Sequence, residues 1–218
     1  MPRPIVIADV ETTGLDPARH EIWEVALIER ATGAAWTYLM EPDLRAAETE
    51  ALAVGRFAER TGALRPATLG DLRRRGPVRR RGGRVPDLWN ATWGGDDSRF
   101  WSDPVDVAAV LSRVLQGATL VAANPAFDAG FIGAFLNRLG HPAQPWHYRL
   151  RDIGSMAYGW LAAQQHLGLY FGEIPAVDAS TDELARAVGV NPAAFDRHTA
   201  LGDCLLVDAM LDRIEGAA

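Results

Sequence analysis

The sequence has one cysteine, Cys204, and no apolar run long enough to cross a membrane. A single cysteine cannot form an internal disulfide, which excludes small disulfide-stabilised domains and fits a reducing compartment. A membrane helix needs about 20 consecutive apolar residues, so no membrane association is expected. The opening MPRPIVIADV has no charged segment followed by a long apolar stretch, so it does not resemble a signal peptide. We expect a soluble, cytoplasmic protein.

Lysine is also absent, since all 22 basic residues are arginines. The net charge of −6 argues against a protein whose whole surface coats nucleic acid. Seven of the arginines, however, lie between residues 73 and 84, a stretch with no acidic residue. The rest of the chain is therefore more acidic than its net charge indicates.

The 218 residues, 48% of them hydrophobic, are typical of one globular domain, which we place at 1–218. Strand patterns come first and then alternate with helix patterns, which indicates an α/β or α+β fold. Residues 61–103 interrupt the pattern with RRRGPVRRRGGR and the Trp-rich WNATWGGDDSRFW, and we interpret them as an insertion. The expected strands are 4–10, 21–31, 35–40 and 119–123; the expected helices are 46–59 (weak at Gly55), 104–116, 126–139, 152–166, 180–188 and 199–214.

Asp9 and Glu11 lie two residues apart in IVIADVETTGLDP, residues 5–17. Side chains two apart on a strand project from the same face. Neighbouring carboxylates repel one another unless a cation lies between them, and oxygen-only ligands suit Mg²⁺ or Mn²⁺. Taken alone, the pair is explained more simply as two acids at a solvated strand end.

Two later segments add acids. LVAANPAFD, residues 120–128, reads as a buried strand that turns into a helix with Asp128 in its first turn, where the helix dipole alone could favour an acid. In HTALGD, residues 198–203, five helical residues turn about 500°, so His198 and Asp203 would differ by about 140° within one helix. They share a site only if His198 precedes the helix or begins it. Otherwise His198 is a surface histidine, whereas leucines surround Asp203.

In this order, Asp-x-Glu-Thr-Thr-Gly-Leu, Asn-x-x-Phe-Asp and His-x4-Asp resemble the three motifs of the DEDDh exonucleases. This family includes the proofreading epsilon subunit of bacterial polymerases, ribonuclease T and oligoribonuclease. The third motif decides the subclass, because the sister subclass has Tyr-x3-Asp there. The resemblance implies an α/β, ribonuclease H-like fold with a five-stranded mixed sheet flanked by helices, the first three strands antiparallel. Many members have His-Asn where this chain has Ala123-Asn124, but that histidine is not among the catalytic residues.

The resemblance implies a 3′→5′ exonuclease that uses two divalent cations, Mg²⁺ or Mn²⁺, to release nucleoside 5′-monophosphates. Its metal ligands would be Asp9, Glu11, Asp128 and Asp203, with His198 as the general base. The backbone at Thr12 would contact the 3′-OH, and Leu15 would wedge beside the last base unless it packs in the core. Asn124 and Phe127 are further candidate substrate contacts, although core packing is the preferred reading of Phe127.

The partners implied are 3′ ends of single-stranded DNA or RNA. Proofreading would need a polymerase partner, and relatives that act on RNA are often homodimers. The insertion, with Trp89, Trp93 and Trp101 near its arginines, is either a nucleic-acid-binding arm or a solvated loop. The alternative function is a non-catalytic nucleic-acid- or polymerase-binding subunit that retains the fold. Intact candidates at all five catalytic positions argue against it.

Overall fold

The computed structural model describes residues 2–62, 65–66, 78–79 and 100–216. Most of the Arg-rich and Trp-rich insertion, including Trp89 and Trp93, therefore lies outside the described residues. Within them, no helix is long and apolar enough to cross a membrane.

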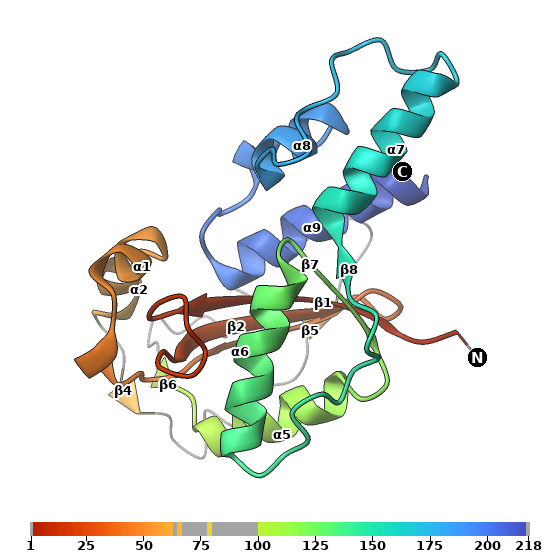
Figure 1. Cartoon of the computed structure of the whole chain (residues 1–218). Helices are drawn as coiled ribbons and strands as arrows, with labels where there is room; N and C mark the ends of the chain where they lie inside the picture. Colours follow the sequence, from red (N-terminus) through yellow and green to blue (C-terminus); the bar gives the residue numbers. More distant parts are fainter. Residues whose placement is uncertain (1, 63–64, 67–77, 80–99, 217–218) are drawn as a thin grey trace.

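The central feature is the mixed sheet expected from the motifs (Figure 1). Its five main strands lie in the order β3-β2-β1-β7-β8, and the two-residue strand β5 pairs with the outer edge of β3. β1, β2 and β3 are antiparallel to one another, while β7 and β8 run parallel to β1. A second, small sheet pairs β4 with β6. The strands are β1 Ile5–Thr12, β2 Ile22–Glu29, β3 Ala34–Leu39, β4 Arg65–Pro66, β5 Val78–Arg79, β6 Phe100–Trp101, β7 Thr119–Ala122 and β8 Arg151–Asp152.

The helices follow the sequence expectations closely, with one exception. The expected helix 46–59 is wrong as a single element, because the chain breaks at Gly55 and Arg56, where Arg56 takes a left-handed φ of 53°. The helices are η1 Leu44–Ala46, α1 Thr49–Val54, α2 Phe57–Thr61, α5 Pro104–Val114, α6 Pro125–Arg138, α7 Ile153–His166, α8 Thr181–Ala187, η2 Pro192–Ala194 and α9 Ala200–Glu215.

Close packing explains the break. A Cβ on Gly55 would lie 2.7 Å from the Trp23 ring and 2.8 Å from Glu11 Oε2. Only a residue without a side chain lets the corner between α1 and α2 approach the sheet this closely. The corner therefore abuts one of the two carboxylates of the first motif.

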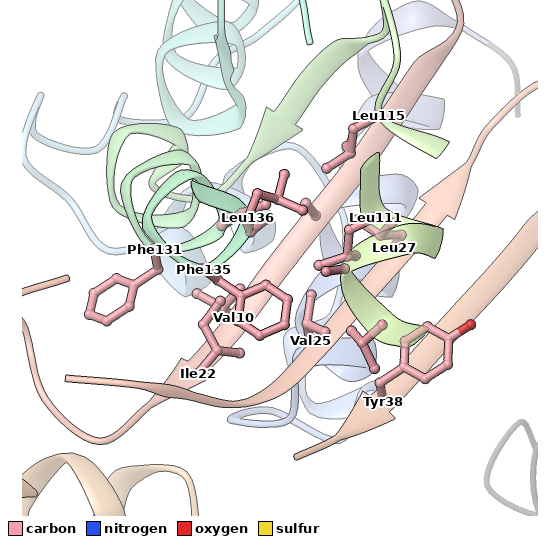
Figure 2. Close-up of a cluster of buried hydrophobic side chains, with 14 of the residues drawn as sticks. Val10, Ile22, Val25, Leu27, Tyr38, Leu111, Leu115, Phe131, Phe135 and Leu136 are labelled. Atoms are coloured by element: carbon pink, nitrogen blue, oxygen red, sulfur yellow. The ribbon is translucent and has the colours of Figure 1, made fainter. Parts of the chain in front are cut away.

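The sheet separates two buried apolar clusters. Val6, Ala8 and Val10 of β1 face the first cluster, which includes residues of α5 and α6 (Figure 2). Ile7 lies on the opposite face, with the cluster formed by α7, α8 and α9. Because side chains alternate along a strand, Asp9 and Glu11 lie on the face covered by α9.

Candidate active site

Asp9 and Glu11 belong to the last half of β1, the central strand of the sheet. Hydrogen bonding to β2 on one side and β7 on the other fixes this strand. The pairing shifts register between Glu11 and Thr12, which marks where the strand leaves the ladder for the following turn. The two carboxylates are thus held rigidly at the strand end, on one face.

Asp203 reaches the same place from the first turn of α9. One carboxylate oxygen from each of Asp9, Glu11 and Asp203 can be chosen so that all lie within 4.8 Å of one another. Three oxygens this close form a donor set suited to a divalent cation such as Mg²⁺ or Mn²⁺. Residues nearly 200 positions apart therefore build one site.

Asp128 is buried in the first turn of α6 and points toward β1. Its Oδ1 accepts a hydrogen bond from the backbone amide of Val10, at 3.1 Å. That amide lies between Asp9 and Glu11 in the chain, and the charge of Asp128 raises the pKa of Asp9, so Asp128 adjoins these two acids. The close group of oxygens formed by Asp9, Glu11 and Asp203 does not include Asp128.

Burial and the close packing of these acids raise the pKa values of Asp9, Glu11 and Asp128. Burial, and after it the charge of Glu24, raise the pKa of Glu11 to about 7. Burial raises the pKa of Asp128 to about 8, although the hydrogen bond from Val10 opposes the rise. The pKa of Asp9 lies well above its ordinary value because of burial and then the charges of Asp128 and Glu11. Such a cluster favours a bound cation or protons.

His198 lies outside the helix, in the loop before α9. This is one of the two placements that the spacing of the third motif allows. The residue is exposed and takes a left-handed φ of 60°, which is uncommon for a residue with a side chain. Thr199 follows as the N-cap of α9, and its hydroxyl accepts from the Gly202 amide at 3.0 Å. Backbone strain of this kind clusters at functional sites.

Comparison with known proteins supports the fold. No protein-family model matches the chain, and no curated protein sequence matches it. Solved structures do match: an E. coli exonuclease I–single-stranded DNA complex with bound zinc ion aligns with a TM-score of 0.64 and 15% identity, over 100% of this chain and 41% of that one. A product-bound exonuclease I gives 0.62 and 15%, over 99% and 44%.

The chain has the fold of exonuclease I. A third structure, E. coli exonuclease I with a dT13 oligonucleotide, agrees at a TM-score of 0.60 and 15% identity, covering 97% of this chain and 41% of that chain. The protein thus spans about two fifths of the length of these exonuclease I chains. The ribonuclease H-like, five-stranded mixed sheet expected from the motifs is confirmed.

The four candidate substrate contacts lie near the ends of β1 and β7. Thr12 is buried and its hydroxyl donates to the Gly14 carbonyl at 2.7 Å, so it shapes the turn. Leu15 is 74% exposed, which excludes core packing in this structure. Asn124 is exposed just before α6, and Phe127 is partly buried against Phe131, with ring centroids 4.8 Å apart. The preferred core reading of Phe127 agrees with this contact.

Sequence reasoning missed several charged residues around the acids. Glu24 of β2 lies directly across from Glu11 and is 2% exposed, while Arg60 of α2 is 4% exposed. Arg197 pairs with both Asp203 and Asp182. The signal for Glu24 was a lone acid inside the apolar run IWEVALI. Arg60 carries no comparable signal, because its partner Glu24 and the His198 carbonyl meet it only in the folded chain. Arg197 lies in a loop, where no periodic pattern marks it.

Proposed function

We propose that the protein is a metal-dependent 3′→5′ exonuclease that hydrolyses single-stranded nucleic acid to nucleoside 5′-monophosphates by a two-metal-ion mechanism. The observation that carries the proposal is the meeting of Asp9, Glu11 and Asp203 oxygens within 4.8 Å. The fold shared with exonuclease I, whose solved complexes contain single-stranded DNA, gives independent support.

The acids present fit a divalent cation. They supply only oxygen and are partly buried close together, and the pKa values of Asp9 and Glu11 are raised by burial and then by neighbouring carboxylates. In the proposal Asp9, Glu11 and Asp203 would hold one cation, and Asp9 and Asp128 would hold a second. When bound, the cations supply Lewis-acid activation of water and stabilisation of the charge that develops on the phosphodiester.

The chain's own residues supply base and substrate contacts. In the proposal His198 takes the proton from the attacking water, because an imidazole nitrogen can accept a proton and the loop position leaves the side chain accessible. The turn at Thr12 receives the terminal 3′-OH. Leu15 packs beside the last base, since its exposed side chain has no competing place in the core. Asn124 and Phe127, at the start of α6, lie beside the bound nucleic acid.

The test uses 5′-labelled DNA and RNA oligonucleotides with the metal varied between Mg²⁺, Mn²⁺ and a chelator. A descending ladder from the 3′ end is expected with metal and none with chelator. Asp203→Ala and His198→Ala should each remove most of this activity in a folded protein. Absence of a ladder on both polymers would overturn the proposal. Binding without hydrolysis would instead favour the alternative of a non-catalytic binding subunit.

DNA and RNA must be compared side by side, because the motifs do not distinguish proofreading, RNA trimming and clearance of short oligomers. A polymerase partner and a homodimer remain predictions. Size-exclusion chromatography with light scattering, alone and with a polymerase subunit, tests both. We assign the activity to the cytoplasm, since buried Cys204 is a free thiol.

A further inference from the structure

Two opposite charges are buried beside the metal-ligand cluster. Glu24 and Arg60 form an ion pair with Arg60 Nη2 and Glu24 Oε1 2.5 Å apart, and the Arg60 guanidinium also lies 5.0 Å from the Trp23 ring centroid. Removing two charges from water costs several kcal/mol per ion, and apolar residues of similar volume are often as stable. A buried pair beside a reactive site therefore calls for an explanation other than stability.

The second oxygen of Glu24 points to that explanation. Glu24 Oε2 accepts a hydrogen bond from the backbone amide of Ala200, at 2.9 Å. Ala200 is the first residue of α9, one turn before Asp203 and two residues after His198. Glu24 thus joins the strand opposite Glu11 to the start of the helix that carries the third motif.

Arg60 contacts two backbone carbonyl groups near the start of α9. Its Nη1 lies 3.3 Å from the carbonyl oxygen of Gly55 and 3.5 Å from that of His198. The Gly55 backbone in turn abuts Glu11, because a Cβ there would lie 2.8 Å from Glu11 Oε2. One guanidinium therefore touches the corner that backs a metal-ligand candidate and the loop that carries the candidate base.

The loop has further ties outside this pair. Arg56 Nη2 pairs with Asp196 Oδ1 at 2.7 Å, and Arg197 Nε pairs with Asp182 Oδ1 at 2.8 Å. These two contacts are more exposed to water and weaker, since surface pairs contribute little. Arg197 also pairs with partly buried Asp203, which ties the loop to α9 directly. Glu24 is the fully buried side chain that accepts from the backbone amide at the first residue of α9.

We propose that Glu24 and Arg60 are positioning residues, whose ion pair sets the place of His198 and Asp203 relative to Asp9 and Glu11. This inference rests on the proposed exonuclease function. The charge of Glu24 beside Glu11 would otherwise add to the repulsion among the acids, and Arg60 offsets it. Neither residue touches substrate in the proposal; both act through the start of α9 and the loop before it.

The chain contains a matched control at the other end of the same two elements. Arg30 Nη1, at the end of β2, pairs with buried Asp208 of α9 at 2.7 Å. This pair joins the end of β2 to α9, as Glu24 does through its hydrogen bond from the Ala200 amide, but it lies more than a full turn beyond Asp203. The double variants Glu24→Leu/Arg60→Met and Asp208→Leu/Arg30→Met replace each pair by apolar residues. Arg30 also pairs with Asp212 and Glu215, but these two acids are partly exposed to water, so the control variant leaves no lone buried charge.

For Glu24→Leu/Arg60→Met we expect kcat on a 5′-labelled oligonucleotide to fall about 100-fold with KM within about twofold, since a shift near 1 Å costs this much. The control double variant should keep wild-type kcat. Hydrogen exchange of peptides covering 196–203 should accelerate in the first variant and not in the second. This exchange measurement needs no substrate, so it reports on positioning even if a variant is inactive.

The failures are distinguishable. If the wild-type protein gives no 3′ ladder, the proposed function fails, and the exchange data alone decide whether the pair holds the start of α9. If the wild type is active but the first variant keeps its kcat and its protection at 196–203, the positioning inference is overturned. Equal losses of kcat in both double variants would also overturn it, because they would reflect general loosening between β2 and α9.

Discussion

At the scale of single residues, the candidate site is built from charges that oppose folding. Asp9, Glu11 and Asp128 all have raised pKa values, and burial is the largest cause for each. Such residues are retained for what they bind, because a neutral side chain of the same shape would suit the core better. Replacing one of these acids by a neutral residue should therefore raise the stability of the metal-free protein and lower its activity.

Asp9→Asn should show this opposition. The amide keeps the size of the carboxylate and removes one buried negative charge, so the metal-free protein should melt at a higher temperature than the wild type. Exonuclease activity should fall more than about 100-fold, since loss of residues that merely orient metal ligands costs 10–100-fold. Thermal melts with chelator and with Mg²⁺ measure the first effect, and the stabilisation by Mg²⁺ should shrink.

The matched control is Asp106→Asn, which neutralises an exposed carboxylate on α5, over the opposite face of the sheet. Activity should not change with this variant, and the melting temperature should fall slightly rather than rise, because Asp106 lies in the first turn of α5, where the helix dipole favours a negative charge. A metal-free Asp9→Asn protein that melts below the wild type would contradict the prediction.

A second residue-scale prediction concerns Gly202, one residue before Asp203. A Cβ there would lie 1.9 Å from the carbonyl oxygen of Asp196, so the loop carrying His198 must move in Gly202→Ala. We expect a loss of about 1–3 kcal/mol in unfolding free energy from the steric clash and about a 100-fold loss of kcat from the displaced base. Urea denaturation and steady-state kinetics measure the two effects.

Gly159→Ala in α7 is the control, because nothing lies within 4 Å of a Cβ at that helical glycine. That variant should gain up to about 1 kcal/mol from helix propensity and keep wild-type kcat. If Gly202→Ala behaved in the same way as the control, the account of the loop would be wrong.

At the scale of elements, sequence patterns located most strands and helices because local signals agreed with the fold. The helices expected at 180–188 and 104–116 form as α8 and α5, because each start carries a local signal: a capping box of Ser180 and Glu183, and Asp103 as N-cap before Pro104. β8 escaped detection since a two-residue strand has no periodicity. The split between α1 and α2 depends on contact with Glu11 and Trp23, which lie far away in the sequence.

The sequence likewise predicted one part of the candidate site and missed another. Asp9, Glu11, Asp128 and Asp203 were accessible through their motifs. Arg60 was not, because its partner Glu24 and the His198 loop meet it only after the chain has folded. Local pattern therefore predicts the metal-ligand candidates, while the residues that position them need the structure.

The turn between β1 and β2 yields an element-scale prediction. Leu15 is 74% exposed there, so Leu15→Ala should leave the melting temperature unchanged. KM for an oligonucleotide should rise about 10-fold, because burial of a leucine against a ligand contributes about 1.5–3 kcal/mol and alanine keeps part of it. Leu169→Ala, at a 67% exposed leucine after α7, should change neither quantity. An unchanged KM for Leu15→Ala would remove Leu15 from the substrate contacts.

At the scale of the whole molecule, two halves of the chain enclose one charged centre. β1 contributes Asp9 and Glu11 from the N-terminal half of the sequence, and α6 and α9 contribute Asp128 and Asp203 from the C-terminal half. The stability of the entire fold is thus linked to the ionisation of a few groups. This linkage has a defined sign.

In the folded protein the pKa of Glu11 is raised from 4.5 to about 7, and the pKa of Asp128 is raised from 3.8 to about 8. Over these windows the folded state holds more protons than the unfolded state, so the unfolding free energy must fall as pH rises. The metal-free protein should therefore lose stability continuously between about pH 4 and pH 8 and level off above that range. Mg²⁺ should reverse the trend, since cation binding favours the deprotonated acids and becomes tighter as pH rises. Denaturant titrations at pH 5.5 and 8, each with chelator and with Mg²⁺, test both statements. A metal-free protein that is more stable at pH 8 than at pH 5.5 would show that these acids are not buried together as the structure has them.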